Sequence, residues 1–210
     1  TNIANEIRSD YLGWTLEHAA VRPVINHAKR LGYRFMVHVG DPSVWWGDGK
    51  PYADTRVFGT KLDQYPPLEW FLDHVAPATV IAAHMGGFVE DPAFLDGLLE
   101  RHDNLVLDSS ATKWIVRYVA RRPDEGRELM LRRSDRILFG SDLVARDSFE
   151  GFDHYASRYW AHQMMWETPC RGESPIDDPD ADDPPKLAGL DLPAGVLEAM
   201  YVGNAQRLGL

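Results

Sequence analysis

The sequence has 210 residues, of which 44% are hydrophobic and one is cysteine. These features suit a folded domain with a buried core, and they exclude a disordered chain and a framework of internal disulfides. The formal charge of −10 argues against a nucleic-acid partner, because binding phosphates requires clustered Lys and Arg. No apolar run is long enough to span a membrane, so no membrane association is expected. We expect a single domain over residues 1–210 in a reducing, cytoplasmic compartment.

The apolar pattern predicts an α/β fold. Four short strands are predicted at 34–39, 79–84, 105–108 and 136–140. Helices are predicted at 15–31, 68–75, 93–101, 112–121, 124–132, 155–166, 192–201 and 204–208. Because continuous apolar strands alternate with helices, the strands are expected to form a parallel sheet covered on both faces.

Proline and aspartate mark two helix starts. Within 15–31, Pro23 leaves open whether the main helix begins there, and Val24, Ala28 and Leu31 can share its buried face. Further along, Asp91 followed by Pro92 is typical of an N-cap and a first helical position.

Two long segments interrupt this pattern. Residues 40–67 form an aromatic-rich connection, and loops of this length in compact domains are usually functional. Residues 173–185 are acidic and rich in proline. They lack the glycine and closing glutamate of a calcium-binding loop, so a solvated loop is expected.

Three strands end in side chains that bind metals. His38, His84 and Asp142 each lie at the carboxyl end of a predicted strand, where ligands bind in parallel α/β folds. A lone histidine there is usually structural, but two histidines and an aspartate at equivalent positions of separate strands favour a functional site. Imidazole and carboxylate suit zinc, manganese or iron, and we predict that the three converge on one metal centre.

Several further residues are candidates for contacts with a substrate. Asp108, at the end of the third strand, either binds substrate or caps the turn that follows it. Lys113 either faces an anionic substrate or lies on the surface. The aromatic residues Trp45, Trp46 and Tyr52 either line the mouth of the pocket or pack within the loop. Arg158 and Trp160 lie in the aromatic helix after the last strand, and either they reach back over the site or, as the stronger expectation, they pack in the core.

Short motifs resemble those of the amidohydrolase-related, metal-dependent hydrolases, a family of (β/α)8 barrels. The resemblance covers most of the chain from about Arg22 onward. It is carried by residues 38–40 (HVG), 83–87 (AHMGG), 108–111 (DSSA), 138–142 (LFGSD) and 203–208 (GNAQRL).

The resemblance implies roles for the three strand-end residues. His38 corresponds to the fifth-strand histidine, a metal ligand, and His84 to the sixth-strand histidine. His84 would bind a second metal, or polarise the substrate or activate water in a one-metal enzyme. Asp142 corresponds to the eighth-strand aspartate, which contacts the metal and accepts a proton from water. Zinc is the expected metal, with manganese or iron as alternatives.

One departure from the family pattern affects both fold and activity. The family's first strand carries a His-x-His pair, and this sequence contains none. We therefore expect a partial TIM barrel, strands five to eight with their helices, and little activity from this segment alone. Half barrels expose strand edges, so pairing with another chain, including homo-oligomerisation, is expected.

The predicted function is hydrolysis of a C–N or C–O bond in a small organic substrate. Non-oxidative decarboxylation by the same family is the close alternative. A non-catalytic, truncated half barrel is the alternative from a different class.

Overall fold

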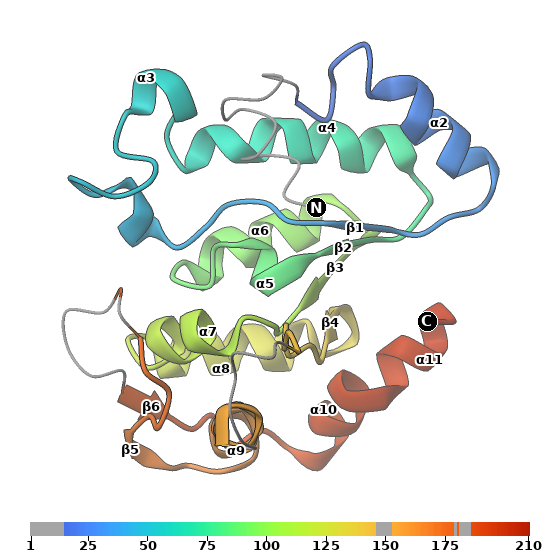
Figure 1. The fold of residues 1–210 in the computed structure, drawn as a ribbon. Coiled ribbons are helices and arrows are strands. Elements are labelled where there is room, and N and C mark those ends of the chain that lie inside the picture. The colour runs from blue at the N-terminus through green and yellow to red at the C-terminus, as the bar shows by residue number, and fades with distance from the viewer. Residues whose placement is uncertain (1–14, 146–152, 179, 181–185) are drawn as a thin grey trace. The chain divides into compact units, whose positions relative to one another are not determined.

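The computed structural model describes residues 15–145, 153–178, 180 and 186–210 (Figure 1). The chain divides into two compact units, each of which is described by itself. The first holds the chain up to Phe88 together with Gly97–Leu107, and the second holds Val89–Asp96 and Asp108–Leu210. That the two units form one domain stays a prediction. Within the described residues, no helix has the length and apolarity needed to cross a membrane.

A parallel sheet forms the centre of the first unit. Strands β1 (Phe35–Val37), β2 (Val80–Ala82) and β3 (Leu105–Asp108) are adjacent in that order, with Val37 opposite Ala82 and Ala82 opposite Leu107. Every residue of β2 and β3 is buried. Continuous apolar strands of this kind need cover on both faces, and the predicted parallel α/β architecture is confirmed.

Helix α2 (Arg22–Arg30) begins beside Pro23. Pro23 lies in its first turn, because a proline deeper inside a helix would clash with the preceding turn. The predicted buried face is wrong, since Val24 is 69% exposed and Ile25 is buried. The reason is that α2 meets its neighbour through polar groups rather than through the Val24 face.

Those polar groups connect α2 to helix α4 (Tyr65–Val75), which lies beside it in Figure 1. The Asn26 amide oxygen lies 2.7 Å from Nε2 of His74, and Lys29 donates to the His74 carbonyl over 2.9 Å. Helix α4 buries Leu68, Phe71, Leu72 and Val75, as its apolar spacing predicts.

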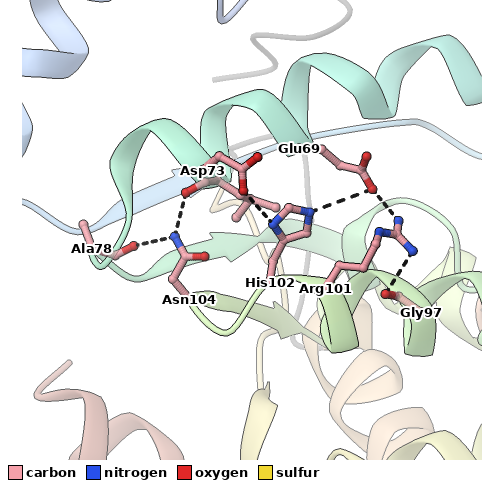
Figure 2. A network of polar contacts seen from close by, with 8 residues as sticks. Glu69, Asp73, Ala78, Gly97, Arg101, His102 and Asn104 are labelled. Carbon is pink, nitrogen blue, oxygen red and sulfur yellow. Dashed lines mark hydrogen bonds and ion pairs between the residues drawn. The ribbon is translucent and has the colours of Figure 1, made fainter.

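A polar network connects α4 to the segment before β3 (Figure 2). His102 is buried, with Nδ1 3.3 Å from Asp73 and Nε2 3.9 Å from Glu69. Arg101 also pairs with Glu69, and Asn104 donates to the carbonyl of Ala78 over 3.1 Å. These contacts hold the segment that leads into β3, because they give partners to polar groups that have none within the helix or the strand.

The long connection 40–67 is ordered and contains short helical turns: η1 (Ser43–Trp46), α3 (Thr55–Phe58) and η2 (Leu62–Gln64). Tyr52 packs between aromatic neighbours, with ring centroids 4.8 Å from Trp46 and 5.2 Å from Phe58. Trp46, Tyr52 and Phe58 therefore form a half-buried aromatic cluster within the connection, called the Tyr52 cluster below.

Helix α6 (Pro92–Arg101) starts as its sequence predicts. The Phe94 backbone N–H donates to Oδ1 of Asp91 over 3.0 Å, so Asp91 is the N-cap and Pro92 is the first helical residue.

The second unit contains strand β4 and helices close to their predicted bounds. These elements are α7 (Thr112–Val119), α8 (Pro123–Arg132), η3 (Ser134–Arg136), β4 (Ile137–Leu138), α9 (Asp153–Glu167), α10 (Ala194–Glu198), the π-turn η4 (Ala199–Gly203) and α11 (Asn204–Leu208). Helix α7 packs against α9. Asn204 donates to the carbonyls of Ser134 and Ile137 over 2.7 and 2.8 Å, which anchors α11 beside β4.

An antiparallel pair in this unit was not predicted. Strands β5 (Arg171–Glu173) and β6 (Lys186–Ala188) flank the acidic segment 173–185, and Gly172 lies opposite Leu187. Positions 179 and 181–185 of that segment lie outside the described residues.

Candidate functional site

His38 is held by a buried carboxylate directly after β1. Its Nε2 lies 2.8 Å from Oδ1 of Asp41, and the Tyr52 hydroxyl donates to Oδ2 of the same carboxylate over 2.7 Å. Asp41 is 1% exposed. An ionised carboxylate only accepts hydrogen bonds, so its bond to His38 places a proton on Nε2 of the imidazole. The Tyr52 cluster thus fixes the orientation of His38 through Asp41.

His84 follows β2 and lies against His38. The two ring centroids are 4.7 Å apart, with an interplanar angle of 76°. This proximity follows from the sheet, because Val37 and Ala82 are opposite each other and the two parallel strands end at the same edge. The structure thus brings together two of the three strand-end residues that the sequence analysis singled out.

The backbone at His84 is strained. His84 and Met85 have φ values of 58° and 53° within the turn α5 (Ala83–Gly86). Left-handed backbone costs a residue with a side chain about 1–2 kcal/mol. Strain of this kind persists where surrounding structure enforces it, and it concentrates at functional sites.

Glycines enforce the turn that carries His84. A Cβ on Gly87 would lie 1.9 Å from the Val39 carbonyl oxygen and 2.4 Å from that of Gly40. The buried hydroxyl of Tyr65 donates to the Gly86 carbonyl over 2.9 Å. The chain after β2 therefore approaches the chain after β1 more closely than any side chain permits, and this brings the two histidines together.

The donor chemistry of this pair fits part of a metal centre. Imidazole nitrogens bind zinc, manganese and iron, and a histidine that binds a metal usually donates its other N–H to a carboxylate, as His38 does to Asp41. A cation bound by His38 would therefore take Nδ1. Within the described ranges no group of three His, Cys, Asp or Glu side chains is placed to hold a cation. The pair accounts for part of a coordination sphere, and its other ligands would have to come from elsewhere.

Asp142 lies in the second unit, beside a pocket of about 440 Å³. Its backbone is also left-handed, with φ of 53°. Lys113, His154 and Arg158 line the same pocket. Burial and then the nearby charge of Arg158 lower the pKa of His154, and burial lowers the pKa of Arg158. The pocket thus combines a carboxylate with cationic groups.

Asp108 caps the turn that follows β3. Its Oδ1 accepts from the Ser110 backbone N–H over 2.9 Å and from the Ser110 hydroxyl. A Cβ on Gly140 would lie 3.3 Å from the Asp108 carboxyl carbon, so Gly140 leaves room for this buried turn. The capping role that the sequence left open for Asp108 is confirmed.

Comparison with known proteins identifies the family. A family model described as Amidohydrolase matches residues 7–208. The chain belongs to the amidohydrolase family. A comparison with curated proteins finds no match.

Solved structures resemble this amidohydrolase chain at low identity. A Pseudomonas putida protein assigned as 2-pyrone-4,6-dicarboxylic acid hydrolase has 14% identity and a TM-score of 0.50, over 95% of this chain and 59% of that one. An uncharacterised TIM-barrel protein from Bordetella bronchiseptica has 15% identity and a TM-score of 0.48, over 93% and 52%. A Burkholderia multivorans amidohydrolase with bound zinc has 15% identity and a TM-score of 0.49, and the match covers 93% of this chain and 59% of that one.

At 14% identity, the likeness to the Pseudomonas putida structure bears on the fold alone. The family match and the parallel strands show that the chain is an α/β protein of amidohydrolase type. It spans between 52% and 59% of the length of the three structures.

The predicted site residues of this amidohydrolase fall into two groups. His38, His84 and Trp45 belong to the first unit, while Asp108, Lys113 and Asp142 belong to the second. Convergence of His38, His84 and Asp142 on one centre therefore stays a prediction, as do the substrate contacts of Asp108, Lys113 and Trp45. Trp45 packs on Tyr52, with ring centroids 5.9 Å apart.

Sequence reasoning missed some neighbours and misplaced others. Asp41 received no role, although an aspartate three residues after His38 was a signal for a supporting carboxylate, and the contact of Tyr52 with that carboxylate was not foreseen. Core packing, the stronger expectation for Arg158 and Trp160, is wrong: Arg158 lines the pocket beside Asp142, in line with the alternative, and Trp160 is 44% exposed. The apolar residues of α9 that are buried lie on another face, at Ala161, Met165 and Trp166.

Proposed function

We propose that the protein is a metal-dependent hydrolase that cleaves a C–N or C–O bond of a small organic substrate. The observation that carries this proposal is the contact between His38 and His84 at the ends of adjacent parallel strands in a member of the amidohydrolase family. Two imidazoles in contact, one of them oriented by a buried carboxylate, are typical of a metal centre rather than of a packed core.

Each residue has a separate part in this proposal. His38 would hold the cation through Nδ1, because Nε2 donates to Asp41. His84 is either a second ligand or the group that orients the scissile bond. Asp142 takes the proton from the attacking water, since a carboxylate is a suitable general base. A divalent cation, zinc in the first instance, would supply Lewis acidity.

We further propose that the chain corresponds to strands five to eight of a (β/α)8 barrel. Supporting this are its parallel strands, its motif order and its 59% coverage of the Pseudomonas putida structure. Active sites of such barrels lie at the carboxyl ends of the strands, where His38 and His84 are found. The remaining metal ligands would then come from the first four strands.

Non-oxidative decarboxylation is the second candidate. The observation that favours it is the pocket beside Asp142, which contains the cationic side chains Lys113 and Arg158 and so suits a substrate carboxylate. Hydrolysis and decarboxylation differ in their products, because only the second releases CO2.

The test uses the complete gene product, loaded with zinc, manganese or iron and screened for release of acid, amine or CO2. His84→Ala and Asp142→Ala should each lower kcat/KM by about 100-fold or more, as expected for residues that act on the reacting groups. The matched control is His27→Ala, an exposed histidine on α2. Unchanged turnover in the first two variants would contradict the assignment. A complete gene product that takes up none of the three metals would support the non-catalytic alternative.

A further inference from the structure

The pocket beside Asp142, in the second unit, has the size and lining of a binding site for a small acid. Its volume of about 440 Å³ falls in the usual range for small-molecule sites. Its lining combines Lys113 and Arg158 with Asp142 and Asp177, and adds the rings of Trp114 and His154. Flat rings beside cations suit a planar organic anion better than a hydrated inorganic ion.

Arg158 is the group that points most directly to a ligand. Its Nη1 donates to the His154 carbonyl over 2.8 Å and lies 3.4 Å from the Ser157 hydroxyl, both on its own helix α9. These contacts fix the guanidinium, and the described part of the chain gives it no carboxylate partner. Burial lowers the pKa of Arg158, so the guanidinium is partly desolvated. A guanidinium in this state presents its remaining N–H groups as a fork that matches a carboxylate.

The start of α7 adds positive charge to the same pocket. Ala111, Thr112, Lys113 and Trp114 all line it. No side chain caps this helix start, which is the positive end of the helix dipole. Lys113 lies 3.8 Å from Asp180, a loose contact that leaves the ammonium close to the pocket. The two cations thus approach the cavity from two different helices.

The acidic residues of the pocket set the orientation of a ligand. Asp142 and Asp177 would repel a carboxylate, so the acid group of a ligand should turn toward Arg158 and Lys113. This places the rest of the ligand beside Asp142, the residue to which the proposed function assigns proton transfer.

We propose that this pocket binds the carboxylate of a small organic acid, with the Arg158 fork as its main contact and Lys113 as a second cation. This inference rests on the proposed function, since it names the substrate class of that enzyme as organic carboxylates. Arg158 is then a residue that determines specificity, because a substrate without the acid group leaves its guanidinium partly desolvated and unsatisfied.

The experiment measures binding without turnover. The 210-residue chain, in buffer without divalent metal and at low salt, is titrated with benzoate and with its uncharged analogue benzamide, followed by calorimetry and by the NMR signal of the Arg158 Nε–H. Benzoate should bind saturably and shift that signal, whereas benzamide should bind about tenfold more weakly or not at all, because it lacks the charge.

Three variants assign the effect to named residues. Arg158→Gln should weaken benzoate binding about tenfold or more, and Lys113→Gln should weaken it less, by about threefold. The matched control Arg122→Gln removes an exposed arginine that pairs with Glu125 outside the pocket lining, and it should bind as the unmodified chain does. If Arg158→Gln lowers the melting temperature of the chain, Arg158→Lys takes its place in the experiment. Lysine keeps the positive charge but lacks the guanidinium fork, so benzoate binding should still weaken.

The outcomes separate this inference from the proposed function. Benzoate binding that is absent, that is matched by benzamide, or that survives Arg158→Gln and Arg158→Lys unchanged overturns the carboxylate subsite, whatever the metal-dependent assays give. Arg158-dependent benzoate binding by the 210-residue chain, together with a complete gene product that has no metal-dependent turnover, leaves the subsite standing and contradicts only the hydrolase.

Discussion

Nε2 of His38 lies 2.8 Å from Oδ1 of Asp41, a carboxylate whose side chain is 2% exposed. This bond decides which ring nitrogen of His38 carries the proton, because an ionised carboxylate accepts and does not donate. Tyr52 holds the other oxygen of Asp41, so the aromatic cluster of a long loop controls a candidate metal ligand. Loop 40–67 is therefore part of the site.

The first prediction concerns this bond. Asp41→Ala should change His38 from one dominant tautomer, protonated at Nε2, to a mixture, because the acceptor is gone. Side-chain ¹⁵N NMR of the histidines reports the tautomer directly. In the metal-loaded complete gene product the same change should weaken metal affinity about 10- to 100-fold. Asp54→Ala, which removes an exposed helix cap, is the control and should leave His38 unchanged. An unaltered His38 tautomer in Asp41→Ala would refute the orienting role.

The second prediction compares two glycines with similar backbone. Gly87 and Gly32 have φ of 69° and 73°, but a Cβ on Gly87 would lie 1.9 Å from the Val39 carbonyl, while one on Gly32 meets nothing within 4 Å. Gly32→Ala should cost about 1 kcal/mol of unfolding free energy, from the left-handed backbone alone. Gly87→Ala should cost about 3 kcal/mol or more, because it also forces the two chain segments apart. Urea unfolding measures both, and equal costs would show that close approach at Gly87 does not matter.

Parts of this architecture could be read from the residues, because their signals are local. Asp91 and Pro92 mark the start of α6 by capping chemistry, and the apolar run 105–108 matches β3. The contact of His38 with His84 follows from one rule, that neighbouring parallel strands end at the same edge.

Other parts depend on tertiary contacts that no local pattern encodes. The left-handed backbone of His84 runs against its own preference and is enforced by the approach of Gly87 to the preceding strand end. The buried side of α2 depends on polar contacts of Asn26 and Lys29 with α4. Strand β5 is exposed at all its residues, so it carries no apolar alternation by which a strand could be recognised.

The third prediction is a pH dependence of stability. His162 is buried, accepts from the Trp166 indole N–H over 3.1 Å at Nδ1, and lies 2.7 Å from the Thr112 hydroxyl at Nε2. Burial lowers the pKa of His162 from 6.5 to about 4. The unfolded chain therefore binds this proton first, and the free energy of unfolding should fall as pH drops from 6.5 to about 4, by up to about 3 kcal/mol.

Urea unfolding at several pH values between 7 and 4 checks this dependence. His162→Gln should be less stable at pH 7, because its fit with Trp166 and Thr112 is poorer, and should lose less stability on acidification. His27→Gln, on the exposed side of α2, should follow the unmodified chain. A His162→Gln curve parallel to that of the unmodified protein would mean that other groups carry the acid sensitivity.

The fourth prediction concerns the ion pair that fixes the segment beside the pocket. Arg117 of α7 pairs with Asp178 through Nε at 2.6 Å and through Nη2, and the two side chains are 3% and 0% exposed. Burial acts to lower the pKa of Arg117, but Asp178 outweighs it and raises that pKa. Asp178 follows Asp177, which lines the pocket, so the pair helps to hold the pocket wall.

Removing Arg117 alone should lower the free energy of unfolding far more than removing Arg117 and Asp178 together. Arg117→Met should cost about 3–5 kcal/mol, because it leaves a buried carboxylate without its counter-charge. The double variant Arg117→Met/Asp178→Leu should recover most of this loss, since Nη1 of Arg117 has no hydrogen-bond partner among the described residues and the pair is incompletely compensated. Arg122→Met breaks the exposed pair with Glu125 and should cost less than about 1 kcal/mol. Unfolding free energies of all three variants test this order, and a double variant as unstable as Arg117→Met would show that the pair itself stabilises the wall of the pocket.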